Sequence, residues 1–169
     1  MADIQVVGLP LIGDDLSRFN SIITNANTYC SGKIGSGYAK QLADGSYPMP
    51  AGAINRVMYI GLEDGNPRSF VIVTIYSDHW YIDLICSAPT ARVTTRKMSL
   101  LRSLRENVNG RKMLSKIADD ARMAGMTYIK LNALEGVITY YYSQGYRFIQ
   151  HCGQIENGWI ARNMNDLEV

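Results

Sequence analysis

The chain has 169 residues, of which 47% are hydrophobic and 19% charged, a composition typical of a folded globular protein and not of a disordered one. We expect a single domain over residues 1–169, since this length can bury a sizeable core. The net charge of +2 is unevenly distributed: residues 92–112 hold seven basic residues and one acidic residue, which leaves −4 for the remainder. One basic segment on a mildly acidic chain indicates one anionic ligand or surface.

The three cysteines, Cys30, Cys86 and Cys152, are widely spaced and odd in number. This pattern argues against a disulfide framework and against a structural zinc site, so we expect no metal. The first residues do not have the pattern of a signal peptide, and no apolar run approaches the roughly 18 residues of a membrane helix. We therefore expect a cytoplasmic protein in a reducing compartment, without a membrane partner.

The first half of the chain predicts a strand, a helix, a weakly patterned connection and three further strands. The expected ranges are an edge strand at 3–9, a helix after Gly13, the connection at 24–52 with a short helix near 38–43, and strands at 55–62, 69–76 and 80–87. The connection is a candidate lid or acceptor-binding loop, although an ordinary surface connection is the simpler interpretation.

The strand at residues 80–87 alternates between two kinds of side chain. A regular period of two puts Trp80, Ile82, Leu84 and Cys86 on one face and His79, Tyr81, Asp83, Ile85 and Ser87 on the other. The first face is apolar and the second is mixed. Such a strand is expected to form the floor of a cleft.

The second half of the chain predicts helices and strands in alternation. The expected ranges are a basic helix or helical loop at 92–108, an amphipathic helix at 111–125 that ends at Gly125, a strand at 128–133, a helix at 136–144, and a terminal hairpin of 146–152 with 159–164 that turns at Asn157 and Gly158. The order of elements predicts an α/β (α+β) fold, with a mixed, mostly antiparallel central sheet flanked by helices.

The start of the 111–125 helix combines Gly110 with two cations, Arg111 and Lys112. The free N–H groups of a helix start bind anions, whereas basic residues there oppose the helix dipole unless an anion is present. Phosphate is therefore a candidate ligand at this point. The alternative is a helix start with two solvated cations.

Two runs of residues resemble the GNAT superfamily of acetyl-CoA-dependent N-acyltransferases. Residues 110–131, Gly-Arg-Lys-Met-Leu-Ser-Lys-Ile-Ala-Asp-Asp-Ala-Arg-Met-Ala-Gly-Met-Thr-Tyr-Ile-Lys-Leu, resemble its acetyl-CoA-binding segment. Residues 137–146, Val-Ile-Thr-Tyr-Tyr-Tyr-Ser-Gln-Gly-Tyr, resemble its following Ala-Ile-x-Phe-Tyr-x-x-x-Gly-Phe pattern. Two positions depart from the family: Val108 replaces a glycine of the pyrophosphate loop, and Leu134 replaces a common asparagine.

The resemblance implies an N-acetyltransferase that moves an acetyl group from acetyl-CoA to a primary amine, on a small molecule or a protein, by direct transfer in a ternary complex. It also implies where the cosubstrate binds. The strand backbone at Leu84, Ile85, Cys86 and Ser87 would hold the pantetheine arm, while Arg105, Val108, Asn109, Gly110, Arg111 and Lys112, with Asn132 and less directly Arg92 or Arg96, would contact the remainder of acetyl-CoA.

Tyr141 is the residue that the resemblance assigns to protonation of the departing thiolate. The attacking amine must be neutral, so a base is also useful, and Asp83 on the mixed strand face is the first candidate, before His79 and Glu135. Each has a structural alternative, because a tyrosine of this kind can simply pack a helix and a strand carboxylate can simply be paired.

Two other functions stay open at this stage. Val108 and Leu134 favour a GNAT-fold protein that has lost catalysis and serves as a CoA-binding, interaction or regulatory module. A nucleic-acid-binding module that uses residues 92–112 is disfavoured, because that segment lacks interleaved aromatic residues. A homodimer is compatible with the sequence.

Overall fold

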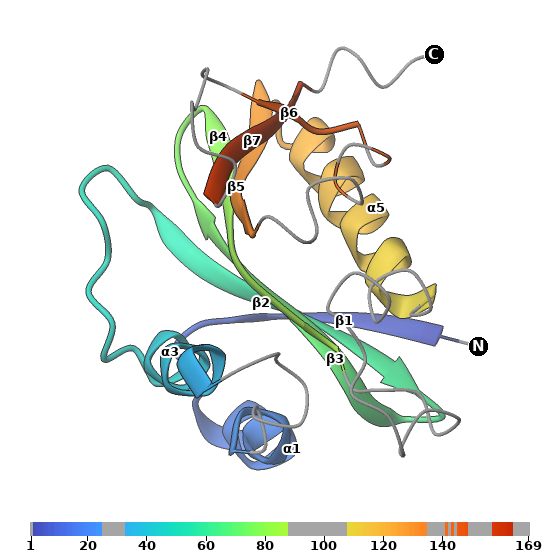
Figure 1. Cartoon of the computed structure of the whole chain (residues 1–169). Coiled ribbons are helices and arrows are strands. Elements are labelled where there is room, and N and C mark those ends of the chain that lie inside the picture. Colours follow the sequence, from blue (N-terminus) through green and yellow to red (C-terminus); the bar gives the residue numbers. More distant parts are fainter. Residues whose placement is uncertain are drawn as a thin grey trace.

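The computed structural model describes residues 2–24, 33–87, 108–134, 141, 143, 145–148 and 157–163. Figure 1 shows a twisted sheet with helices on both sides. The elements are β1 (Ala2–Gly8), α1 (Gly13–Thr24), α3 (Lys33–Asp44), β2 (Asn55–Glu63), β3 (Asn66–Ile75), β4 (His79–Ser87), α5 (Val108–Met123), β5 (Tyr128–Leu134), β6 (Arg147–Phe148) and β7 (Asn157–Asn163).

The described strands form one seven-stranded sheet in the order β1-β2-β3-β4-β5-β7-β6. All neighbouring strands are antiparallel except β4 and β5, which run parallel and have α5 between them in the chain. The mixed, mostly antiparallel sheet is therefore confirmed, as is the edge position of the first strand.

Two apolar cores lie on the two sides of this sheet, which we name the α5 face and the α1/α3 face (Figure 1). On the α5 face, Val71 and Val73 of β3 pack with Leu114 and Ile117 of α5. On the other face, residues of β2 and β3 such as Met58, Ile60, Phe70 and Ile72 pack against α1 and α3 through Phe19, Ile22 and Leu42. The period of two in β2 and β3 supplies both cores at once.

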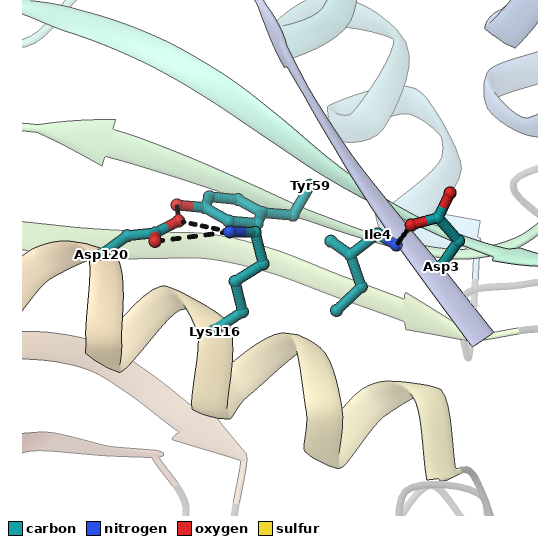
Figure 2. A network of polar contacts seen from close by, with 5 residues as sticks. All are labelled: Asp3, Ile4, Tyr59, Lys116 and Asp120. Carbon is teal, nitrogen blue, oxygen red and sulfur yellow. Dashed lines mark hydrogen bonds and ion pairs between the residues drawn. The ribbon is translucent and has the colours of Figure 1, made fainter. Parts of the chain in front are cut away.

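A polar contact ties α5 to the sheet on its own face. The hydroxyl of Tyr59 in β2 donates a hydrogen bond of 2.7 Å to Asp120 Oδ2, and Lys116 Nζ lies 3.3 Å from the same oxygen. Figure 2 shows these three side chains meeting between the helix and the sheet. Tyr59 is buried and its hydroxyl has a partner, so the polar atom does not weaken this core.

The regular alternation predicted for the third of the central strands is wrong. The pairing of β3 with β4 shifts between Ile72 and Val73, which pair with Leu84 and Ile82, so Asp83 is an extra residue in β4. Such a β-bulge reverses the faces that follow it. Trp80 and Ile82 therefore pack on the α5 face together with Ile85, while Leu84 and Cys86 pack on the α1/α3 face.

The helix that precedes β2 is longer than predicted. Instead of a short helix near residues 38–43, α3 spans Lys33–Asp44 and contributes Ala39, Leu42 and Ala43 to the α1/α3 core. Glycine and serine obscured this periodicity, and tertiary packing outweighs their low helix propensity.

The end of α5 follows the prediction for Gly125. This residue has a φ of 79°, the N–H of Gly125 donates to Arg122 O, and the N–H of Met126 donates to Ala121 O. These two bonds are a Schellman motif, which requires a left-handed residue and favours glycine.

The terminal hairpin is confirmed as a strand pair, but its predicted turn is wrong. Arg147 and Phe148 of β6 pair with Ala161 and Ile160 of β7. Strand β7 already begins at Asn157, and its Gly158 pairs with Ala133 of β5. Pairing with β5 extends the strand through the residues that would otherwise favour a turn.

Several predicted elements lie outside the described residues. These are the basic segment up to residue 107 and most of the helix at 136–144, of which Tyr141 and Ser143 are described and helical. Among the described helices, none has the length and apolar character needed to cross a membrane.

Candidate functional site

Strands β4 and β5 pair over only part of their lengths. Their parallel pairing runs from His79 with Tyr128 to Ile82 with Leu131. Beyond these partners β4 continues to Ser87 and β5 to Leu134 without pairing to one another. The two strands therefore part at Ile82, and the unpaired edge of β4 can bind an extended ligand by backbone hydrogen bonds.

Asp83 lies at this fork, directly after the last residue of β4 that pairs with β5. It is also the bulged residue between β3 and β4. The hydroxyl of Thr74 in β3 donates to Asp83 Oδ2 at 2.5 Å, and the hydroxyl of Tyr38 in α3 donates to Oδ1 at 3.3 Å. One carboxylate oxygen is thus held firmly, while the other has a long contact to a helix side chain.

A buried arginine supports this carboxylate through Thr74. Arg56 in β2 is only 4% exposed, and its Nε donates to Thr74 Oγ1 at 3.0 Å. Its two terminal nitrogens donate to the carbonyl oxygens of Tyr47 and Pro48, at 3.0 and 3.2 Å. Every nitrogen of the guanidinium therefore has a partner, and the residue joins the segment before β2 to the polar centre of the sheet.

The pKa of Asp83 is raised above its ordinary value, because burial disfavours the charged form. The hydrogen bond from Thr74, the charge of Arg56 and the hydrogen bond from Tyr38 act in the opposite direction and limit this rise. A carboxyl group with a raised pKa at the point where two strands part is a better proton acceptor than an ordinary solvent-exposed carboxylate.

Tyrosines surround Asp83 on the same face. Burial, followed by the charge of Asp83, raises the pKa of Tyr38, of Tyr76 and of Tyr81, in the last case to about 12. The rings of Tyr38 and Tyr47 contact edge to face with their centroids 5.1 Å apart. The raised pKa values keep Tyr38, Tyr76 and Tyr81 neutral at physiological pH, so these phenols can donate or accept hydrogen bonds.

Tyr141 lies on the opposite face from Asp83. It is 6% exposed, belongs to the α5 core, and contacts the Tyr146 ring edge to face at 5.7 Å. The structure thus places the two predicted catalytic residues on different sides of the sheet.

The predicted phosphate-binding turn is part of a helix. Val108, Asn109 and Gly110 form the first turn of α5, so the backbone N–H groups of this segment belong to a helix start. Arg111 and Lys112 follow as exposed cations, and the first turn holds no acidic residue. This arrangement fits an anion.

The predicted pantetheine strand differs in its side chains from the expectation. Leu84 is half-buried on the α1/α3 face, Ile85 is half-buried on the α5 face, and Ser87 ends the strand. Cys86 is disulfide-bonded, which contradicts the expectation that the cysteines stay unpaired, and both other cysteines lie outside the described residues. Regular alternation predicted His79 and Cys86 on opposite faces, but the bulge places them on one face. Because Cys86 is disulfide-bonded, its sulfur cannot act as a nucleophile beside His79.

The remaining predicted site residues divide into two groups. Arg105, Arg92, Arg96 and Glu135 lie outside the described residues, and for Asn132 the structure describes only its place in β5. His79, the second base candidate, contacts Asp78 Oδ1 at 2.7 Å and stacks between the rings of Tyr76 and Tyr128. It belongs to the paired part of β4, away from the fork.

Sequence reasoning missed the surroundings of Asp83: Thr74 and Tyr38, which donate hydrogen bonds to it, and Arg56 and Tyr47, which contact these two residues. A weak signal was present, since Thr74 interrupts an apolar run and Arg56 begins one. Their meeting depends on strand register, because Arg56 pairs with Thr74 and Thr74 pairs with Tyr81 across three strands. Within the described residues, no cluster of His, Cys, Asp or Glu side chains could hold a metal ion.

No protein-family model matches this sequence, and no similar sequence was found among curated proteins. Solved structures do match the fold. Aminoglycoside 6'-acetyltransferase type Ii aligns with a TM-score of 0.63 at 11% identity, over 95% of this chain and 97% of that one. The ribosomal-protein-S18-alanine N-acetyltransferase from Escherichia coli aligns with a TM-score of 0.59 at 13% identity, over 96% and 94%.

N-acetylglutamate synthase from Neisseria gonorrhoeae, in complex with coenzyme A and N-acetyl-glutamate, aligns with a TM-score of 0.57 at 12% identity. The alignment covers 97% of this chain and 35% of that one. This chain has the GNAT fold. The likeness spans nearly the whole chain. The parallel pair β4–β5, whose strands part at Ile82 and are connected in the chain through α5, lies at the centre of the sheet.

Proposed function

We propose that this GNAT-fold protein is an N-acetyltransferase that moves the acetyl group of acetyl-CoA to a primary amine by direct transfer in a ternary complex. The observation that carries the proposal is the position of Asp83: a carboxyl group with a raised pKa at the residue where β4 and β5 part. A base at this position can act on an amine that approaches a thioester held in the fork.

The cosubstrate would be held by backbone groups and cations of this chain. The β4 edge at Leu84, Ile85, Cys86 and Ser87 has no β5 partner and can bond the pantetheine arm as an added strand does. The first turn of α5, with its free N–H groups and Arg111 and Lys112, fits the pyrophosphate. We include Arg105 and Asn132 as further predicted contacts.

The proposed chemistry begins with proton transfer from the acceptor's ammonium to Asp83, which leaves a neutral amine. Acetyl-CoA supplies the thioester carbonyl, and the amine nitrogen forms a bond to this carbon as the C–S bond breaks. Tyr141 gives its hydroxyl proton to the departing thiolate sulfur, and the second proton of the nitrogen restores this hydroxyl through solvent. The products are an amide, a free thiol and a protonated Asp83, which releases its proton to solvent.

Two of the matched structures are named for amine acceptors, an aminoglycoside and an alanine of a ribosomal protein, and a third was solved with coenzyme A. These names support an amine acceptor for the present fold and leave its size open, from a small molecule to a protein.

Two measurements test the proposal. Thermal unfolding with coenzyme A at 100 times its dissociation constant should show a stabilisation of about 2.7 kcal/mol. Thiol release from acetyl-CoA should then depend on an added primary amine. Replacement of Tyr141 by Phe should lower that rate about tenfold, because a thiolate leaves readily without an acid.

Absence of any shift with millimolar coenzyme A would contradict the proposal. A shift without thiol release from any amine would instead support a CoA-binding module that has lost catalysis.

A further inference from the structure

The surroundings of Asp83 carry information about the acceptor, beyond the presence of a base. On the α1/α3 face, Asp83 is approached by Tyr38 from α3, by Tyr81 from β4 itself and by Tyr76, which directly follows β3. Tyr47, 38% exposed, contacts the Tyr38 ring and marks where this cluster reaches solvent. We name Asp83 and these four tyrosines the tyrosine cluster.

The cluster holds one carboxylate. Asp83 is the acidic residue whose charge raises the pKa of Tyr38, Tyr76 and Tyr81, and no second described carboxylate acts on these three phenols. Its Oδ2 is engaged by Thr74 at 2.5 Å, whereas the contact from Tyr38 to Oδ1 is 3.3 Å. An ammonium group can therefore bond Oδ1 and also donate to the Tyr38 hydroxyl, since an ammonium has three donors.

One buried cation, Arg56, lies against the tyrosine cluster. The guanidinium of Arg56 reaches Asp83 through Thr74 and lies 5.3 Å from the centroid of the Tyr47 ring. Its charge opposes the rise that burial causes in the pKa of Asp83 and in the pKa of Tyr76. One incoming ammonium would share the carboxylate with this arginine, whereas a second ammonium held near the same carboxylate would be repelled by the charge of Arg56 and would find no second described carboxylate within the tyrosine cluster.

The rings around the carboxylate suit an apolar body next to the charge. Half-buried tyrosines present both a hydroxyl and an aromatic face, and such faces favour a cation and the methylene groups attached to it. The stacked rings of Tyr76, His79 and Tyr128 continue this aromatic surface across β4 to β5.

We propose that the acceptor is a monocationic primary amine with an apolar stem, bound by its ammonium between Asp83 and Tyr38, and that polyamines and other polycations are disfavoured. This inference rests on the proposed function for its meaning as an acceptor site, but the binding site itself does not require catalysis.

Hexylamine and 1,6-diaminohexane provide a matched pair, because they have the same chain length and differ by one terminal ammonium. In a thiol-release assay with acetyl-CoA, kcat/KM for hexylamine should exceed that for the diamine by about tenfold, as expected for one unbalanced like-charge contact. Tyr38→Phe should raise the KM for hexylamine about threefold or more with a smaller change in kcat, since it removes one hydrogen bond to the ammonium.

Calorimetric titration of hexylamine without acetyl-CoA separates this inference from the proposed function. Asp83→Asn should weaken hexylamine binding about tenfold or more, whereas the matched change Asp119→Asn, on the exposed side of α5, should leave binding unchanged. Thermal unfolding of each variant shows whether it is folded.

The possible results are distinct. Equal or better use of the diamine, no effect of Tyr38→Phe on KM, or no amine binding at all would overturn the inference. Asp83-dependent binding of hexylamine without any acetyl transfer would uphold the inference and refute the proposed function. Acetyl transfer to the diamine but not to hexylamine would overturn the inference and uphold the proposed function.

Discussion

The two faces of the sheet bury their polar groups in different ways. On the α5 face, the polar contact of Tyr59 with Asp120 is at the side of the helix, where Asp120 is half-buried and Lys116 also reaches it. On the α1/α3 face, Arg56 and Thr74 are buried within the sheet and lead to Asp83.

This difference suggests that the polar contact on one face contributes to stability and that the polar residues on the other face serve a function. Removing charges from water costs free energy that an apolar core does not incur, so packing alone gives no reason to keep Arg56 and Asp83 inside the sheet. The Tyr59–Asp120 contact, by contrast, satisfies a buried hydroxyl at the rim of a well-packed core. We infer that the Tyr59–Asp120 contact on the α5 face mainly stabilises the fold, whereas Arg56, Thr74 and Asp83 on the α1/α3 face give up stability for a reactive carboxylate.

The sharpest test exchanges a carboxylate for an amide on each face. Asp83→Asn should lower acetyl transfer about 100- to 1,000-fold, because the base is lost, while the free energy of unfolding stays the same or rises. Asp120→Asn should lower the free energy of unfolding by about 1–2 kcal/mol, because it weakens a charge-assisted hydrogen bond, with little effect on rate. Steady-state kinetics and urea unfolding measure both. Equal effects of the two changes on rate would remove the distinction between the faces.

Arg56→Met should produce the largest loss of stability among the polar residues named here. The substitution leaves Thr74 Oγ1 and two carbonyl oxygens without their donor and removes the positive charge that acts on Asp83, and we expect a loss of about 3 kcal/mol in chemical denaturation. Arg68→Met is the matched control on an exposed position of β3 and should change stability by less than about 0.5 kcal/mol. A loss as small as that of the control would mean that the Arg56 network contributes nothing.

Tyr59→Phe tests the opposite face. The lost hydrogen bond to Asp120 should lower the free energy of unfolding by about 1–1.5 kcal/mol, measured by urea unfolding, without changing the pH profile of the rate. Arg122→Ala, which removes the exposed ion pair with Asp119, is the control and should cost less than about 0.5 kcal/mol.

The pH dependence of stability gives the smallest but most specific effect. Folding raises the pKa of Asp83, so the native state holds this proton more tightly than the unfolded chain does. The group therefore favours folding at pH values below the unfolded pKa of about 4, and this contribution is lost as pH rises through the native pKa. Asp83→Asn should gain stability relative to the wild type over that rise. An opposite slope would show that the pKa of Asp83 is lowered instead.

Much of the fold could be predicted from local patterns. The apolar runs of β2, β3 and β5 and the amphipathic face of α5 have strong periods, and Gly125 marks a helix end that only a left-handed residue can form. The GNAT fold was indicated by residues 110–131 and 137–146, and the sheet order and structural matches confirm it. The roles predicted for Tyr141 and for the cosubstrate contacts stay predictions.

The faces of β4 could not be predicted, because a bulge is set by the pairing of two strands and not by either strand alone. The sequence by itself determined which residue types are available: a carboxylate in a mixed strand, a glycine-ended helix with two basic residues near its start, and many tyrosines. Tertiary structure decided which of them meet. Register aligned Arg56, Thr74 and Tyr81 across three strands, the bulge made Asp83 the extra residue at the fork, and α3 brought Tyr38 from 45 residues away. Contacts between residues so distant in the chain depend on packing free energy shared by the whole sheet, which no local pattern records.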